Sequence, residues 1–199
     1  MSKTQLTNNY LKHMSQNPVQ HFLIENFYQT MLNLAQPLDV SSLLDVGCGE
    51  GFTLAKFAEK KIGNTFEGID YSKDALSIGK KTFPNLTLQH ASIYDLPYQS
   101  SSFDLVICTE VLEHLKNPHQ ALKEVLRVSK QYILLSVPNE PFFMLANFLR
   151  GKNVRSFGND PEHINHWTIF SFQRFIKKQN AEIKTIRLPF PWIIFLLTV

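Results

Sequence analysis

The stretch Leu43-Leu-Asp-Val-Gly-Cys-Gly-Glu-Gly51 decides the fold class of this chain. Its apolar start predicts a buried strand that ends at Val46, and glycine then occupies every second position up to Gly51. Glycine lets the backbone turn sharply and come close to a ligand. Residues 52–61 return to helical spacing, so the pattern predicts a strand, a tight turn and the start of a helix. A tight turn without a ligand also favours glycine, and both interpretations stay open at this point.

A second strand end carries an acidic residue at the spacing typical of a nucleoside site. The run Thr65–Ile69 predicts a strand that closes at Asp70, and an acidic residue about 20 residues after such a turn accepts hydrogen bonds from ribose hydroxyls. Tyr71 is predicted to pack on an adenine face. Ser72 is predicted to cap the next helix, which is the purely structural role for this segment.

Several ordered motifs between about Ser41 and Pro138 resemble those of the class I S-adenosylmethionine-dependent methyltransferases. They are Asp45-Val-Gly-Cys-Gly-Glu-Gly51, Gly68-Ile-Asp-Tyr-Ser72, Leu96-Pro-Tyr98, Ser102-Phe-Asp-Leu-Val-Ile-Cys108 and Glu110-Val-Leu-Glu-His114, the last similar to the ubiquinone-biosynthesis type. The resemblance implies S-adenosylmethionine as the cofactor, bound by Asp45, Gly47, Cys48, Gly49, Asp70, Tyr71, Ser92, Ile93 and Glu110. Many relatives carry an acid at the position of Ser92, where the hydroxyl group is a weaker acceptor for the adenine amino group.

Strands and helices alternate along the chain. Strands are predicted near 42–46, 65–69, 86–90, 104–108 and 132–137, and helices near 19–35, 52–61, 73–81 and 118–130. This alternation predicts an α/β fold with a parallel sheet. A helix near 168–179 and two strands, 182–188 and 192–198, follow. The family resemblance implies a Rossmann-like seven-stranded sheet, mostly parallel with an antiparallel last strand and helices on both faces, and a chain that holds the complete fold.

Length and composition predict one domain of 199 residues with a substantial core. We divide it into an N-terminal helical cover (1–40), a cofactor-binding core (41–138), an acceptor-side insert (139–167) and a last helix with a strand pair (168–199). A net charge of +3 is too small to indicate nucleic acid by itself. The two cysteines lack C-x-x-C spacing, the N-terminus is polar and the apolar tail is short, which together predict a cytoplasmic chain without a transmembrane segment.

The motif Glu110-Val-Leu-Glu113-His114 begins where the fourth strand ends, at the ligand-binding edge of such a sheet. On a helix, positions i, i+3 and i+4 face one way, so these three side chains are predicted to converge. With His163 they offer carboxylate and imidazole ligands for a divalent cation. The set resembles the metal site of small-RNA 3′-terminal 2′-O-methyltransferases, in which a later histidine lies four residues before a tryptophan, as His163 does here.

The competing interpretation needs no metal, and we favour it. Glu-Val-Leu-Glu-His motifs are also widespread in methyltransferases without a known metal, where the residue matching Glu110 contacts the methionine end of the cofactor. A histidine then acts as the catalytic base, since imidazole titrates closest to neutral pH. The candidates for this role are His114, His163 and His166.

The segment 139–167 breaks the alternation and is predicted to cover the acceptor side. Its apolar helix near 141–150 is suited to roofing an active site, to touching a lipid surface or to packing on the sheet edge. Arg150, Lys152 and Arg155 beside it either meet an anionic substrate group or form a solvated face.

Together these features predict an S-adenosylmethionine-dependent methyltransferase that acts on a small-molecule acceptor, most simply at an oxygen, with a nitrogen or a carbon as the less favoured alternatives. Metal-assisted 2′-O-methylation of an RNA end is the second hypothesis, and a non-catalytic cofactor-binding partner subunit is the third. An NAD-dependent oxidoreductase is disfavoured, because the dinucleotide fingerprint needs its third glycine where this chain has Phe52. The acceptor and the oligomeric state stay open.

Overall fold

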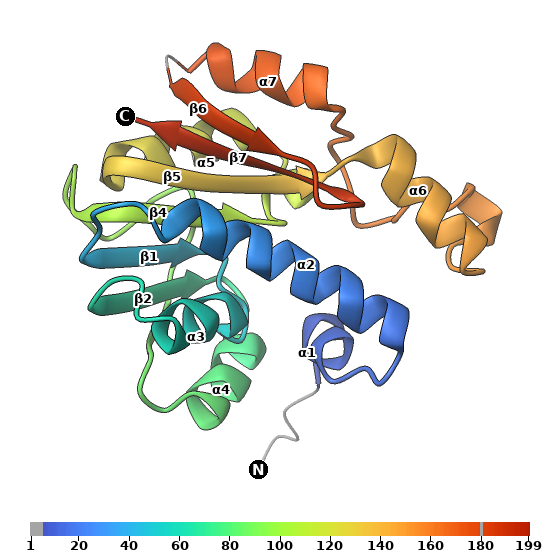
Figure 1. The fold of residues 1–199 in the computed structure, drawn as a ribbon, viewed down its shortest axis with the longest axis horizontal. Helices are drawn as coiled ribbons and strands as arrows, with labels where there is room; N and C mark the ends of the chain where they lie inside the picture. The colour runs from blue at the N-terminus through green and yellow to red at the C-terminus, as the bar shows by residue number, and fades with distance from the viewer. Residues whose placement is uncertain (1–5, 180) are drawn as a thin grey trace.

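The computed structural model describes residues 6–179 and 181–199, so the first five residues of the predicted N-terminal cover lie outside it. A seven-stranded sheet in the order β3-β2-β1-β4-β5-β7-β6 forms its centre (Figure 1). β1 to β5 pair in parallel, and β7 runs antiparallel to both β5 and β6. The expected α/β fold with an antiparallel last strand is confirmed. The strands are β1 Ser42–Val46, β2 Thr65–Asp70, β3 Thr87–His90, β4 Phe103–Thr109, β5 Ser129–Pro138, β6 Glu182–Arg187 and β7 Trp192–Thr198.

Helices cover both faces of the sheet. Successive residues of a strand point to opposite faces, and the buried core divides accordingly into two large clusters. Leu43 and Leu105 pack with α2 on one face, whereas Leu44 and Val106 pack with α5 and α7 on the other. The helices are α1 Asn8–His13, α2 Pro18–Ala35, α3 Phe52–Glu59, α4 Lys73–Thr82, α5 Pro118–Val128, α6 Glu140–Leu149 and α7 Ile169–Lys177.

The strand order places a ligand site at one edge of the sheet. β1 and β4 are neighbours, but β1 leads to β2 on one side whereas β4 leads to β5 on the other. Such a switch point opens a crevice at the carboxyl ends of the parallel strands. α1, the start of α2 and α6 all lie beyond this edge (Figure 1). Among the described residues, no helix is both long enough and apolar enough to cross a membrane.

The expected helix over the Glu110–His114 motif is wrong. β4 continues to Thr109, Glu110 takes a left-handed backbone conformation with φ +58°, and only Leu112–His114 forms a short 3₁₀ turn, η1. A left-handed residue turns the chain sharply at the strand end, so the face geometry of an α-helix does not apply here. Ser72, in contrast, caps α4 as predicted, accepting a hydrogen bond from the N–H of Ala75 at 3.2 Å.

Candidate active site

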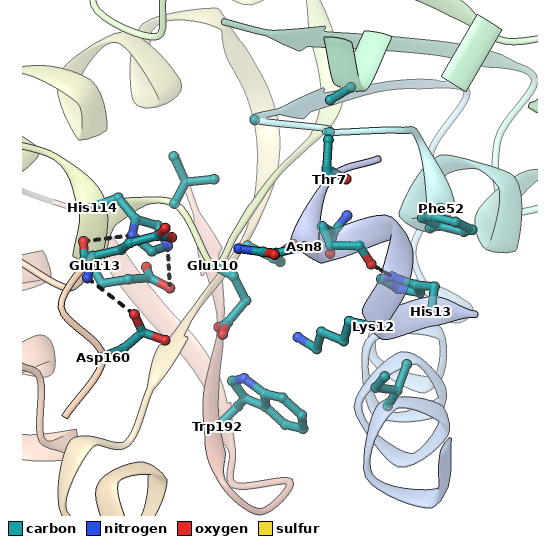
Figure 2. Close-up of a pocket in the computed structure, with 18 of the residues that line it drawn as sticks. Thr7, Asn8, Lys12, His13, Phe52, Glu110, Glu113, His114, Asp160 and Trp192 are labelled. Carbon is teal, nitrogen blue, oxygen red and sulfur yellow. Dashed lines mark hydrogen bonds and ion pairs between the residues drawn. The ribbon is translucent and has the colours of Figure 1, made fainter. Parts of the chain in front are cut away.

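A cavity of about 1020 Å³ opens at the carboxyl ends of β1 and β4. This volume lies at the upper end of the range typical of ligand pockets. Its walls come from α1 with the start of α2, the glycine turn, the segment after β4, and the insert that includes α6. Figure 2 shows Glu110 between Lys12 and His13 on one side and Glu113 and His114 on the other.

The glycine turn between β1 and α3 brings bare backbone to the wall of this cavity. Gly47, Cys48 and Gly49 all line it. Gly47 has φ +80°, and a Cβ atom there would overlap the side chain of Val111. The N–H groups of Gly47 and Cys48 both donate to the carbonyl oxygen of Ile69, at 2.8 and 2.9 Å. The turn is therefore tied to the end of β2, and glycine is required at its first position.

Asp70 lies at the end of β2 beside the glycine turn. Its Oδ2 accepts from the N–H of Gly49 at 2.8 Å, and its Oδ1 accepts from the N–H of Ser72 at 2.7 Å. Each carboxylate oxygen can accept a second hydrogen bond, so the group retains an acceptor pair for a ligand diol. Tyr71 follows it on the rim of the cavity and is largely exposed.

Two predicted cofactor residues lie outside the cavity lining. Asp45 is buried beneath the turn, where burial and then the charge of Asp70 raise the pKa of Asp45 to about 8. Ser92 accepts a hydrogen bond from the N–H of Tyr94, while its neighbour Ile93 does line the cavity. The side chains of Asp45 and Ser92 therefore do not line the cavity, and each can influence a ligand only by positioning its own backbone segment.

α1 closes the cavity next to the glycine turn. The side chains of Thr7 and Asn9 both donate to the carboxylate of Glu50, which is fully buried in that turn. The ring of His13 stacks on Phe52, with centroids 4.0 Å apart and planes 6° from parallel. These contacts fix the short helix over the site although its sequence is polar.

Lys12, Glu110 and Glu113 bring three ionisable groups to one cavity (Figure 2). Burial lowers the pKa of Lys12, and the charges of Glu110 and Glu113 oppose this shift. Glu110 accepts a hydrogen bond from the hydroxyl of Ser136 at 2.9 Å. Glu113 is 1% exposed and, among the described residues, neither of its carboxyl oxygens has a hydrogen-bond partner. Burial and then the charge of Glu110 raise the pKa of Glu113, so this group either keeps its proton or binds a cation.

His163 is held by a buried carboxylate from the first residue of α6, Glu140. The Nδ1 atom of His163 lies 2.7 Å from Oε1 of Glu140, and the two side chains are 5% and 4% exposed. Burial opposes a charge on His163, but the hydrogen bond to Glu140 and its charge outweigh burial and raise the pKa of His163. Because Nδ1 is occupied, Nε2 is the nitrogen available for a ligand.

Three of the four predicted metal ligands come together. The donor atoms of Glu113, His114 and His163 lie within 4.8 Å of one another. The Nε2 atom of His114 is 3.9 Å from Oε1 of Glu113, and the two imidazole centroids are 5.1 Å apart. Glu110 lines the same cavity but does not belong to this group.

A family model described as a methyltransferase domain matches residues 44–133. The chain is 29% identical over 121 residues to a probable S-adenosylmethionine-dependent methyltransferase of Mycolicibacterium smegmatis, an alignment that covers 60% of this chain and 45% of that protein. The matched segment carries a methyltransferase domain. The chain is also 31% identical over 104 residues to the ubiquinone biosynthesis O-methyltransferase of Glaesserella parasuis, covering 48% of this chain and 43% of that protein. The chain spans less than half the length of these two relatives.

The methyltransferase domain also shares its fold with solved structures. Magnesium protoporphyrin IX methyltransferase of Synechocystis PCC 6803, determined with bound S-adenosylhomocysteine, superposes with a TM-score of 0.67 at 15% identity. The match covers 92% of this chain and 88% of that one. At this level of identity the likeness concerns the fold alone.

The cavity of the methyltransferase domain fits S-adenosylmethionine. Gly47 and Gly49 present bare backbone to the cavity, and Asp70 has two carboxylate oxygens that suit the hydroxyl pair of a ribose. Tyr71 presents a flat ring on the same rim. At the other end of the cavity, Glu110 supplies a carboxylate suited to the ammonium group of the methionine moiety.

The three candidate histidines differ in their position relative to the cavity. His163 and His114 line the cavity, whereas His166 lies outside the lining, is 45% exposed and has its Nδ1 3.7 Å from Oε1 of Glu140. Sequence reasoning missed Glu140 and Lys12. Glu140 follows the carboxyl end of β5, next to β4 in the sheet, and that position was the available signal. Lys12 had no such signal, because α1 has no apolar periodicity.

Proposed function

We propose that this chain transfers the methyl group of S-adenosylmethionine to a hydroxyl oxygen of a small-molecule acceptor. The cofactor supplies an electrophilic methyl group, so the protein has to orient the acceptor and remove its proton. The observation that supports this proposal is the His163–Glu140 pair, which faces the same cavity as the glycine turn and Asp70.

In this proposal His163 is the catalytic base. In this arrangement the Nδ1–H group of His163 donates a hydrogen bond to the Glu140 carboxylate, and Nε2 faces the cavity unprotonated. Nε2 then takes the proton from the acceptor hydroxyl as the oxygen attacks the methyl group. The Glu140 charge stabilises the imidazolium that results. Small-molecule O-methylation also matches the name of the Glaesserella relative.

A methyl-transfer assay with radiolabelled S-adenosylmethionine and a panel of small phenols and hydroxy acids tests the proposal. We expect His163→Asn to lose at least about a hundredfold in rate, the scale of one general base, with unchanged affinity for S-adenosylhomocysteine. His119→Asn is the matched control, because His119 contacts Gln179 away from the cavity lining. Equal rates for His163→Asn and the parent chain would overturn the assignment of the base. Cofactor binding without transfer to any acceptor would instead favour the non-catalytic partner subunit.

The cluster of Glu113, His114 and His163 favours one second candidate, metal-assisted 2′-O-methylation of an RNA end. The three residues offer donor atoms within 4.8 Å of one another, and the Glu113 carboxyl oxygens have no hydrogen-bond partner among the described residues. Glu140 holds the other nitrogen of His163, as carboxylates often do behind a metal-binding imidazole. A cation there would lower the pKa of an acceptor hydroxyl.

Chelation distinguishes the two candidates. In the metal-assisted case a chelator abolishes transfer to a short RNA, a divalent ion restores it, and Glu113→Gln removes the metal response while cofactor affinity stays. In the metal-free case the chelator has no effect on transfer to small acceptors. A Glu113→Gln chain that keeps its metal response would exclude Glu113 as a ligand.

A further inference from the structure

The outward face of α6 is apolar, although it meets solvent. Phe142 and Leu145 are each 50% exposed and Leu149 is 76% exposed. These residues stand at positions i, i+3 and i+7, which fall on one side of a helix. The solvent face of a helix in a globular protein is normally polar or charged. The only charged residue within α6 is Glu140, and its side chain is buried.

Exposed apolar side chains also occur on α1 and at the start of α2, across the cavity from α6. Leu11 and Leu23 line the cavity from one side, and Phe143 and Ala146 line it from the other. The loop between β6 and β7 adds Phe190, whose ring centroid is 6.3 Å from that of Phe142. We call the exposed side chains around this mouth the apolar rim: Leu11, Met14, Val19, Phe22, Phe142, Leu145, Leu149, Val154, Phe157, Leu188 and Phe190.

The apolar rim lies at one end of the molecule. α1, the start of α2, α6 and the turn between β6 and β7 all project past the carboxyl ends of the parallel strands (Figure 1). Most of the large apolar side chains that the described residues expose belong to this end. Exposed apolar side chains that gather at one end of a molecule mark an interaction site.

The chain segments that carry the apolar rim contain basic but no acidic residues. Residues 1–24, 141–159 and 187–199 contain no aspartate or glutamate. Arg150, Lys152, Arg155 and Arg187 are exposed in the last two of these segments. Of these four, Lys152 lies 3.9 Å from Asp160, and the structure gives no ion pair for the other three among the described residues. The rim therefore combines large apolar side chains with three basic side chains, Arg150, Arg155 and Arg187, for which the described residues provide no ion pair.

We propose that the apolar rim docks the chain on the surface of an anionic lipid bilayer. Apolar side chains enter the boundary between headgroups and acyl chains, and flanking basic side chains pair with lipid phosphates. Single-stranded RNA instead requires flat rings on which bases stack, and most of the rim is aliphatic. Self-association would bring like charges together, which disfavours a second copy as the partner.

Docking of this kind also defines the acceptor class. The cavity opens within the apolar rim, so its mouth faces the bilayer and receives a hydroxyl compound dissolved in the lipid. This extension rests on the proposed methyl transfer, whereas docking itself does not. Vesicle binding needs neither cofactor nor acceptor, so the two proposals fail separately.

Sedimentation with vesicles tests docking on the full chain. We expect binding to vesicles of phosphatidylglycerol mixed with phosphatidylcholine, weaker binding to phosphatidylcholine alone, and a decrease with added salt. Leu145→Glu with Leu149→Glu should remove binding. Phe170→Glu is the matched apolar control, because Phe170 is 76% exposed but lies on α7, away from the cavity. It should bind like the parent chain.

Charge reversal tests the basic part of the rim. Lys152→Glu with Arg155→Glu should lower the partition coefficient at least about tenfold, given the contribution of each basic residue near an anionic surface. Lys177→Glu with Lys178→Glu, exposed at the end of α7, is the matched control and should lower it much less. Thermal unfolding checks that every variant folds.

Four results would overturn the proposal. The first is the absence of vesicle binding by the parent chain, and the second is equal binding of the Leu145→Glu, Leu149→Glu variant. The third is binding of a single-stranded RNA, but not of vesicles, that is lost in Lys152→Glu, Arg155→Glu, which would assign the rim to nucleic acid. A dimer in solution that dissociates on Leu145→Glu, Leu149→Glu, without vesicle binding, would assign it to a second copy.

Discussion

Glu140 holds His163 through a single 2.7 Å hydrogen bond, with both side chains buried beside the cavity. The contact joins the start of α6 to a segment 23 residues further along the chain. The insert, which we propose to cover the acceptor side, therefore also contributes both the proposed catalytic base, His163, and the carboxylate that holds it, Glu140.

The pH dependence of transfer reports on this pair. The pKa of His163 is raised because Glu140 outweighs the effect of burial, so the rate of the parent chain should rise with pH through a value above 6.5. Glu140→Gln removes the charge and should move this limb to lower pH. Glu162→Gln, an exposed neighbour, is the control and should keep the parent profile. An unchanged profile in Glu140→Gln would contradict the pairing.

Stability gives an independent measure of the same contact. A histidine with a raised folded-state pKa stabilises the fold fully below its unfolded pKa, and this contribution is lost as pH rises through the folded value. The difference in the free energy of unfolding between the parent chain and Glu140→Gln should therefore be larger at pH 5.5 than at pH 8.5. Denaturant unfolding at both pH values measures it, and a difference that widens with pH would refute the assignment.

Asp70 should control cofactor affinity. Asp70→Asn removes the charge from the two hydrogen bonds proposed for the ribose, and a charged hydrogen bond contributes roughly 1.5–3 kcal/mol. We expect affinity for S-adenosylhomocysteine to fall about tenfold to a hundredfold in calorimetry. Asp74→Asn, four residues along the chain and exposed on α4, should bind normally. Equal affinities for the two variants would exclude Asp70 as the ribose ligand.

Gly47 should tolerate no side chain. Gly47→Ala meets two costs: a left-handed backbone, φ +80°, and overlap with Val111. Gly151→Ala isolates the first cost, because Gly151 has φ +70° and nothing lies within 4 Å of its added Cβ. We expect Gly151→Ala to lose about 1–2 kcal/mol of stability and to keep cofactor affinity, whereas Gly47→Ala loses both. Similar behaviour of the two variants would mean that close packing at Gly47 is unimportant.

Asp104 ties β1 to β4 at the edge opposite the cavity. Its Oδ2 accepts from the N–H groups of Ser41 and Ser42, each at 3.0 Å. Burial opposes this charge, but these bonds and Lys130 outweigh burial and lower the pKa of Asp104 to about 2. Asp104→Asn should therefore cost about 2 kcal/mol at neutral pH, and the difference should disappear as pH falls toward 2. Asp39→Asn, exposed before β1, is the control for denaturant unfolding.

The sheet could be predicted because local pattern and burial agree along its strands. The predicted strand 42–46 matches β1, and the order of strands and helices follows from their alternation. α1 could not be predicted in this way. It is a six-residue polar helix, too short to be stable alone, and it exists because Thr7, Asn9 and His13 find partners across the chain.

The residues of the candidate site could be predicted from the sequence better than the way in which they are arranged. Asp70 and the glycine turn lie where the strand–turn–helix pattern places them, because short-range geometry determines both. Glu110 shows the opposite case: its left-handed turn depends on how β4 meets the neighbouring backbone, which no local propensity encodes. Glu140 and His163 are brought together only by the fold of the insert, so their pairing had no signal in the spacing of either residue.

The way α1 is attached should separate the rate of product release from the stability of the fold, two properties that usually change together. α1 adds no residue to the buried core of the sheet, yet Thr7 and Asn9 fasten it to Glu50 over the cavity next to the glycine turn. Such a segment can detach and return without unfolding of the core. We therefore expect the time that a spent cofactor stays bound in the proposed site to depend on a few polar contacts near the N-terminus. A substitution at Thr7 or Asn9 would change how fast the product departs and leave the melting temperature where it was.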